Sequence, residues 1–312
     1  MTDASPTSPS LETRRLAVFL AVAFGLSWAT AAVISLTGGL GSDRMVLPRV
    51  PLSLVLVAGP YMFAPAVANV VARLVTNEGF ERTLLRPRFR ARWRVYAVAW
   101  LAPVALAVIG VALYFLARPG QFGGLDAAGA FVPVVDGTAA LPTEAFVLLQ
   151  VVQLLVVAPL VNSLFTLGEE FGWRGYLLPK LLPLGVRRAL LAHGVVWGVW
   201  HWPIIAMGHN YGLDYPGAPW VGMLLMVVFT VAVGVVFGWL SLRSGSVWPA
   251  VLAHAMVNGA GGLGLLFLVG EPDLLLGPTA SGVLGTLPWL VVAAWLLADR
   301  ARLAGVGPLA RA

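Results

Sequence analysis

Six side chains able to do acid–base or hydrogen-bonding chemistry lie within or beside long apolar stretches of the chain. They form three short clusters along the sequence, whose members are Glu169, Glu170, Arg174, His201, His254 and Asn258. Ionisable residues at membrane depth are costly, and they tend to face a protein interior or a watery cavity. Carboxylate, imidazole and amide groups together can activate a water molecule and stabilise an oxyanion. The clusters are therefore candidates for hydrolytic chemistry.

The first cluster places two adjacent carboxylates, Glu169 and Glu170, five and four residues before an arginine, Arg174. Consecutive residues of a helix point about 100° apart, so the two carboxylates face different partners. Glu170 and Arg174 are spaced i, i+4, which predicts an ion pair that keeps Glu170 ionised. Glu169 is then the candidate general base. The alternative is that both carboxylates are interfacial charges at a helix end.

The other clusters contribute histidines and an amide. His201 lies in a run of tryptophans, where a histidine can equally be a hydrogen-bonded core residue. His254 and Asn258 are spaced i, i+4 and therefore project from one helix face, where they could alternatively serve as hydrogen bonds between packed helices. Two further histidines, His193 and His209, lie near opposite ends of the same apolar stretch and are interpreted as interfacial.

The composition indicates a membrane protein. Of 312 residues 59% are hydrophobic and 11% charged, and the mean hydropathy is +0.87, which leaves too little polar surface for a water-soluble globule. Apolar stretches of about 20 residues match a hydrocarbon core about 30 Å thick, where helices satisfy their own backbone groups. Cysteine is absent, which excludes disulfides and thiol chemistry. We expect an all-α polytopic protein with about eight transmembrane helices, at about 16–38, 51–74, 95–117, 143–167, 189–207, 219–241, 246–269 and 283–298.

The basic residues predict the orientation in the membrane, since cytoplasmic loops carry the excess of arginine and lysine. Arginines and Lys180 gather in the connections at 75–94 and 168–188, beside residue 243 and after residue 299, whereas the alternate connections are mostly acidic. Both termini are therefore predicted to be cytoplasmic, in the plasma membrane of a prokaryote. This distribution explains the net charge of +6 without nucleic acid as a partner. We divide the chain into a disordered tail (1–13), one transmembrane domain (14–299) and a second tail (300–312).

The same topology predicts the depth of the clusters. Glu169 lies near the cytoplasmic boundary, and His254 and His201 lie roughly 12 and 18 Å deeper, at ~1.5 Å per residue. A cavity that opens to the cytoplasm could reach all three. The depth of His201 fits this arrangement least well.

With these motifs in order, the sequence resembles the CAAX prenyl protease and bacteriocin-processing (CPBP) family, also called the Abi or type II CAAX endopeptidase family. That family carries Glu-Glu-x-x-x-Arg, Phe-x-x-x-His and His-x-x-x-Asn/Asp motifs on successive helices of an eight-helix fold. Glu169, Glu170 and Arg174 match the first motif, and His254 and Asn258 the third. His201 matches the second, although Trp197 replaces the usual Phe. The resemblance covers a protease-like core at about 143–260.

The resemblance implies an intramembrane endopeptidase that acts on a membrane-associated peptide or protein. Prenylated or otherwise lipid-tethered substrates are among those it implies. Glu169 and His201 would activate water, and His254 and Asn258 would bind the oxyanion. A competing mechanism makes Glu169, His201 and His254 ligands of Zn²⁺. The lack of a His-Glu-x-x-His motif and the amide at Asn258 favour a mechanism that needs no cofactor. The alternatives are a non-catalytic immunity or scaffold protein on this fold, and a proton-coupled transporter.

Overall fold

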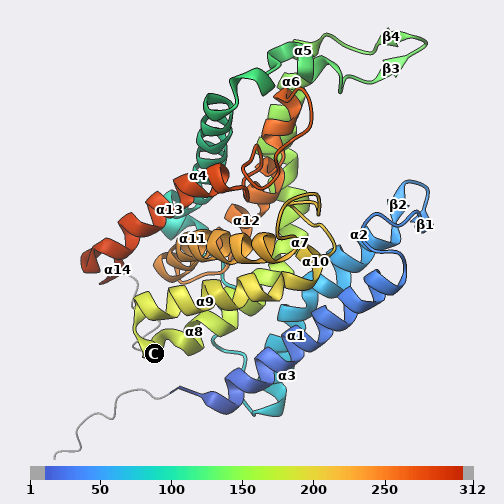
Figure 1. Cartoon of the computed structure of the whole chain (residues 1–312). Coiled ribbons are helices and arrows are strands. Elements are labelled where there is room, and N and C mark those ends of the chain that lie inside the picture. Colours follow the sequence, from blue (N-terminus) through green and yellow to red (C-terminus); the bar gives the residue numbers. More distant parts are fainter. Residues whose placement is uncertain (1–10, 305–312) are drawn as a thin grey trace, which may run out of the picture.

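The chain folds into a bundle of helices with two short β-hairpins at its margin (Figure 1). The computed structural model describes residues 11–304. Most of the N-terminal tail expected at 1–13, and residues 305–312 of the expected C-terminal tail, lie outside the described residues. The hairpins are β1 (Met45–Leu47) with β2 (Val50–Pro51), and β3 (Val134–Val135) with β4 (Thr138–Ala139). Figure 1 shows both on the side of the molecule opposite the start of the first helix. The expected all-α class is confirmed.

The helices differ widely in length. The α-helices in chain order are α1 (Thr13–Leu36), α2 (Leu52–Leu56), α3 (Met62–Val75), α4 (Phe89–Ala117), α5 (Gly124–Gly129), α6 (Thr143–Val152), α7 (Ala158–Gly172), α8 (Leu178–Leu181), α9 (Val186–Trp200), α10 (Trp202–Ala206), α11 (Trp220–Ser244), α12 (Trp248–Ala260), α13 (Val283–Ala298) and α14 (Arg300–Ala304). Wider π-helical turns join α2 to α3, α6 to α7, and α7 to α8, so these segments form continuous rods.

The number of long apolar helices is smaller than expected. Among the described residues, six are long and apolar enough to cross a membrane, and α13 is a shorter apolar helix. The expected span at 189–207 is instead α9 and α10, because the helix is interrupted at His201. The expected span at 143–167 is part of a rod of 42 residues, Thr143–Leu184. The first motif therefore lies inside a helix rather than beyond its end.

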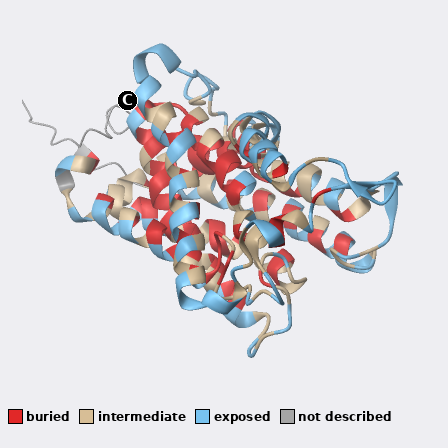
Figure 2. Cartoon of the chain, turned by 90° about the horizontal axis from the view of Figure 1, so that it is seen from above, coloured by how far each residue is buried: buried red, intermediate tan, exposed pale blue. Residues whose placement is uncertain are grey.

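The centre of the bundle is α11, the most deeply buried of the long apolar helices (Figures 1 and 2). Helix α9 packs closely against it through two glycines one turn apart. A Cβ atom at Gly194 would lie 2.6 Å from the Cα of Val231, and one at Gly198 would lie 2.7 Å from the Cα of Val227. Small residues at such spacing let membrane helices approach closely. This contact fixes which side of α9 faces α11, and with it the position of the second motif.

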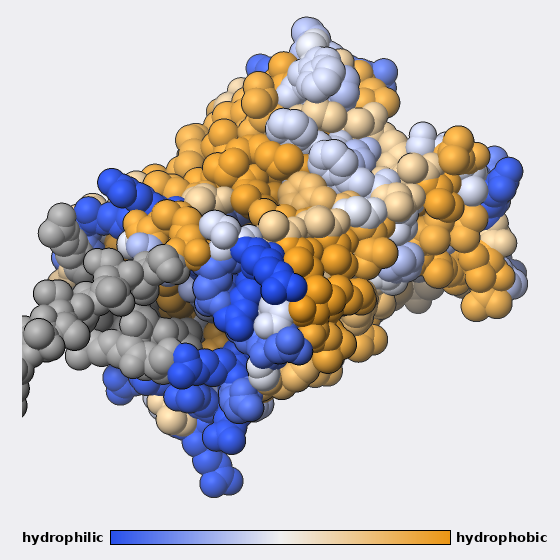
Figure 3. Space-filling model, turned by 90° about the horizontal axis from the view of Figure 1, so that it is seen from below, coloured by the Kyte–Doolittle hydropathy of each residue, from blue (hydrophilic) through white to orange (hydrophobic). Residues whose placement is uncertain are grey.

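The outer surface is largely apolar. Large hydrophobic side chains such as Leu36, Leu116 and Leu160 are strongly exposed, and hydrophobic atoms surround separate hydrophilic patches on the face in Figure 3. A water-soluble protein would not expose apolar surface on this scale, whereas lipid covers it at no cost. The chain is an integral membrane protein.

Candidate active site

Glu169 is held at the wall of an internal cavity by an indole from the neighbouring helix. The side chain is 3% exposed, and the Nε1–H of Trp197 donates a hydrogen bond to its Oε2 at 2.9 Å. Among the described residues, no side chain or backbone group donates to its Oε1. The close approach of α7 to α3 helps to place it, since a Cβ at Gly168 would lie 2.9 Å from the carbonyl oxygen of Met62.

Glu170 has other partners than Glu169, namely one guanidinium and one imidazole group. Its Oε1 accepts a hydrogen bond from Nη1 of Arg174 at 2.7 Å and lies 2.9 Å from Nδ1 of His254. Glu170 and Arg174 are both fully buried, so the ion pair predicted from the i, i+4 spacing is confirmed. The guanidinium of Arg174 also lies over the ring of Trp197, 4.1 Å from its centroid. Glu170 therefore positions His254 and is itself positioned by Arg174.

Helix α12 is fixed against α7 by side chains that bind its backbone. Asn162 donates to the carbonyl oxygen of Ala255 at 3.1 Å, and Thr166 donates to that of Val251 at 3.0 Å. These contacts set the rotation of α12 about its axis. As the i, i+4 spacing predicted, His254 and Asn258 both line the cavity.

His201 directly follows the last residue of α9 and is oriented by its own backbone. Its Nδ1 lies 2.8 Å from the carbonyl oxygen of Trp197, a pure acceptor, so Nδ1 carries the proton in the neutral ring. Nε2 then has a free lone pair. The carbonyl of Trp200, one residue earlier, accepts a hydrogen bond from the hydroxyl of Tyr61 at 2.6 Å, which ties this helix end to the rod of α2 and α3.

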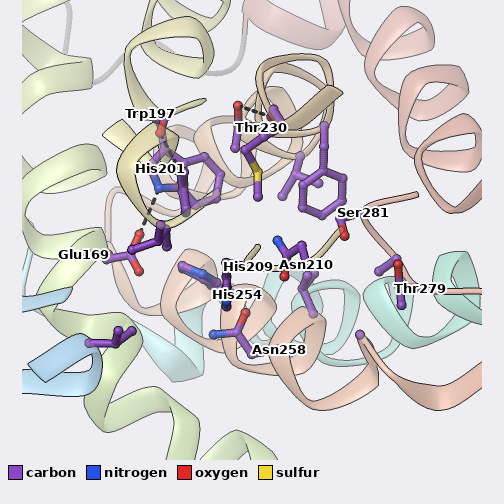
Figure 4. Close-up of a pocket in the computed structure, with 18 of the residues that line it drawn as sticks. Glu169, Trp197, His201, His209, Asn210, Thr230, His254, Asn258, Thr279 and Ser281 are labelled. Atoms are coloured by element: carbon purple, nitrogen blue, oxygen red, sulfur yellow. Dashed lines mark hydrogen bonds between the residues drawn. The ribbon is translucent and has the colours of Figure 1, made fainter. Parts of the chain in front are cut away.

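The four proposed reactive residues line one cavity of about 630 Å³ (Figure 4). Glu169 and His201 lie at one end of the view, and His254 and Asn258 lie on an adjacent wall. His201 and Glu169 line the same cavity although the sequence predicted different depths for them, and Glu169 lies within the long rod rather than at the end of a span. Apolar side chains such as Met226, Phe229 and Val257 complete much of the lining.

The cavity extends toward the loops at 207–219 and 261–282, and its lining includes Asn210, Gly262, Leu274, Thr279 and Ser281. None of the described lining residues comes from the arginine-rich connections at 76–88 and 180–188. The cavity was predicted to open to the cytoplasm, on the side of these connections, and this orientation stays a prediction. Hydropathy does not show which loops fold over the site.

Sequence reasoning missed or misplaced several residues around the site. Trp197 was noted only as a replacement of the family's usual Phe, yet its N–H donates to Glu169. His209 was interpreted as interfacial but lines the cavity, as does Tyr61. His193 was also interpreted as interfacial and is instead fully buried, with its ring edge-on to Trp173. An indole next to a carboxylate cannot be read from spacing alone, because the two residues lie on different helices.

The residues do not converge as a zinc site in this arrangement. Zinc needs three or four ligand atoms about 2.0–2.3 Å from one point. Within residues 11–304, no group of three or more His, Cys, Asp or Glu side chains could hold a metal ion. The Nδ1 atoms of His201 and His254 are directed at other protein acceptors, so that only their Nε2 atoms could serve as ligands.

Part of the chain matches known proteins. Residues 144–260 match the model of the family described as type II CAAX prenyl endopeptidase Rce1-like. The chain is also 27% identical over 93 residues to CAAX prenyl protease 2 of Methanococcus maripaludis, a match that covers 29% of this chain and 34% of that protein. The chain thus spans about a third of the length of this curated relative. The matched segment 144–260 contains all six candidate site residues.

Proposed function

From its membership of the CPBP family, through residues 144–260, we propose that the protein is an intramembrane endopeptidase that hydrolyses a peptide bond of a membrane-associated substrate. The observation that carries this proposal is the convergence of Glu169, His201, His254 and Asn258 on one cavity in an otherwise apolar bundle. Their roles in catalysis follow from which of their atoms are already bound and which are left for a ligand.

Glu169 and His201 activate the water. Trp197 holds one carboxylate oxygen of Glu169 and leaves the other for a water O–H. Nε2 of His201 has a lone pair that accepts the second water hydrogen, because Nδ1 carries the ring proton. As the water oxygen attacks the scissile carbonyl carbon, its proton passes to Glu169. Glu169 then returns this proton to the departing amine, and the C–N bond breaks.

His254 and Asn258 stabilise the oxyanion formed on the scissile carbonyl. The carboxylate of Glu170 faces Nδ1 of His254 and fixes the ring, which leaves Nε2 for the scissile carbonyl, and an N–H at that atom donates to the oxyanion. The amide N–H of Asn258 provides a second donor one turn along the same face of α12. Arg174 pairs with Glu170 and takes no part in the reaction itself. The proposed mechanism uses no cofactor, so we expect activity to survive exhaustive chelation and elemental analysis to find no zinc.

The substrate is expected to be a peptide or protein in contact with membrane lipid. The apolar lining of the cavity suits a hydrophobic segment or a lipid tether, and nothing in it favours nucleic acid. If the arginine-rich connections and both termini are cytoplasmic, the cavity is reached from the opposite side of the membrane. The test is cleavage of a membrane-tethered reporter by the purified full chain, compared between wild type, Glu169→Gln and Glu144→Gln. Glu144 is an exposed glutamate in the same rod.

A further inference from the structure

A second cavity lies between the start of α4 and the end of α11. It encloses about 520 Å³, and its lining includes Arg90, Arg92, Arg94 and Arg243 together with Trp93 and Trp239. None of these residues lines the cavity of Glu169. We refer to this second cavity as the arginine groove.

The helix geometry is broken where three of the arginines lie. Arg90 and Arg94 are spaced i, i+4, and Arg92 between them has φ −130° and ψ 18°, which is not helical. All three residues line the groove, as do their neighbours Ala91, Trp93 and Val95. This irregular first part of α4 therefore concentrates positive charge at the groove.

The charge in the groove has no counter-ion among the described residues. Within residues 11–304, none of Arg90, Arg92, Arg94 and Arg243 lies within ion-pair distance of a carboxylate. Arg174, by contrast, pairs with Glu170. Four unpaired guanidinium groups in one concavity attract a multivalent or delocalised anion, and phosphate matches the fork of donors on arginine.

The groove is amphipathic. Trp93 is 55% exposed, and Val98, which also lines the groove, continues onto the exposed apolar surface of α4. The indole of Trp239 is fixed by a hydrogen bond from Nε1 to the carbonyl oxygen of Arg302, 3.3 Å away. Tryptophan is the residue that favours the membrane–water interface. A ligand that fills this site must combine an anionic group with an apolar chain.

We propose that the arginine groove binds the phosphodiester headgroup of an anionic phospholipid, with an acyl chain lying along α4. A free phosphate shares the charge but would leave the apolar wall uncovered. The groove lies at the end of the bundle that carries the arginine-rich connections, so the lipid belongs to the leaflet on that side. The site is independent of the proposed peptidase activity.

The test is binding of phosphatidylglycerol, phosphatidylcholine and inorganic phosphate to the purified full chain in detergent, titrated by native mass spectrometry. The groove variant is Arg92→Gln/Arg94→Gln. The matched control is Arg86→Gln/Arg188→Gln, which removes the same charge from exposed positions at the same end of the bundle. Each arginine near an anionic lipid contributes about fivefold in affinity, so the groove variant should bind phosphatidylglycerol about 25-fold more weakly. The control variant should bind it like wild type.

Three outcomes would overturn the proposal: equal binding of phosphatidylcholine, equal weakening in both double variants, or full competition by inorganic phosphate at the lipid's own concentration. The melting temperature in phosphatidylcholine checks that each variant folds. If the groove variant fails to fold, Arg92→Lys/Arg94→Lys replaces it. That pair keeps the charge but lacks the guanidinium fork, so it should bind phosphatidylglycerol more weakly than wild type, and unchanged affinity would also contradict the proposal.

Discussion

The indole Nε1–H of Trp197 donates a hydrogen bond to Oε2 of Glu169 at 2.9 Å, across the contact between α9 and α7. The carbonyl oxygen of the same Trp197 lies 2.8 Å from Nδ1 of His201. One residue thus orients both groups proposed to activate water. Its ring also lies against Arg174, which supports Glu170 and through it His254.

Replacing Trp197 by Phe removes the N–H donor and keeps an aromatic ring beside Arg174. A hydrogen bond to a charged group is worth about 1.5–3 kcal/mol, so we expect kcat for reporter cleavage to fall at least about tenfold. The control is Trp248→Phe, which removes an indole bonded to the carbonyl of Leu85 away from the site. A wild-type kcat in Trp197→Phe would show that this hydrogen bond does not position Glu169 for catalysis.

Replacing Glu170 by Gln leaves Arg174 as a buried charge without its counter-ion. Removing one partner of a buried ion pair costs about 3–5 kcal/mol, so the variant should unfold at clearly lower denaturant concentration. Activity should also fall, since His254 loses the carboxylate at 2.9 Å. Glu144→Gln, in an exposed part of the same rod, should match wild type. If Glu170→Gln were as stable as wild type, the pair would contribute nothing to the fold.

Replacing Gly198 by Ala tests the close contact of α9 and α11. The added methyl would lie 2.7 Å from the Cα of Val227 and 2.5 Å from Oγ1 of Thr230, so the helices must separate. Overpacking of this kind costs about 1–3 kcal/mol and would displace Trp197, so both stability and kcat should fall. Gly25→Ala in α1 is the control, because nothing lies within 4 Å of its Cβ position. Equal behaviour of the two variants would contradict close packing here.

The orientation can be measured by single-cysteine labelling, because the natural chain has no cysteine. Leu213→Cys lies in a loop at the cavity end, where Leu213 is 47% exposed, and Arg188→Cys lies at the arginine-rich end. With a membrane-impermeant maleimide on intact cells, Leu213→Cys should react, and Arg188→Cys should react only after permeabilisation. The reverse pattern would place the cavity loops in the cytoplasm and would overturn the predicted topology.

The sequence alone predicted the membrane class, the Glu170–Arg174 pair and the shared face of His254 and Asn258, because each depends on local spacing or composition. It did not predict that the apolar stretch around Glu169 continues to Leu184, since the motif's charges look like the end of a span. It also could not place His201, whose depth depends on where α9 ends and how it packs on α11. Contacts between helices, such as Trp197 with Glu169, leave no periodic signal in the chain.

The most direct test of the account is cleavage of a membrane-tethered reporter by the purified full chain and by Glu169→Gln. The substitution keeps the size of the side chain and can still accept the indole hydrogen bond, but it removes the base that takes the proton from water. The account predicts that wild type and Glu144→Gln cleave the reporter and that Glu169→Gln loses at least about 100-fold in kcat while remaining folded. Cleavage by Glu169→Gln at the wild-type rate would contradict it.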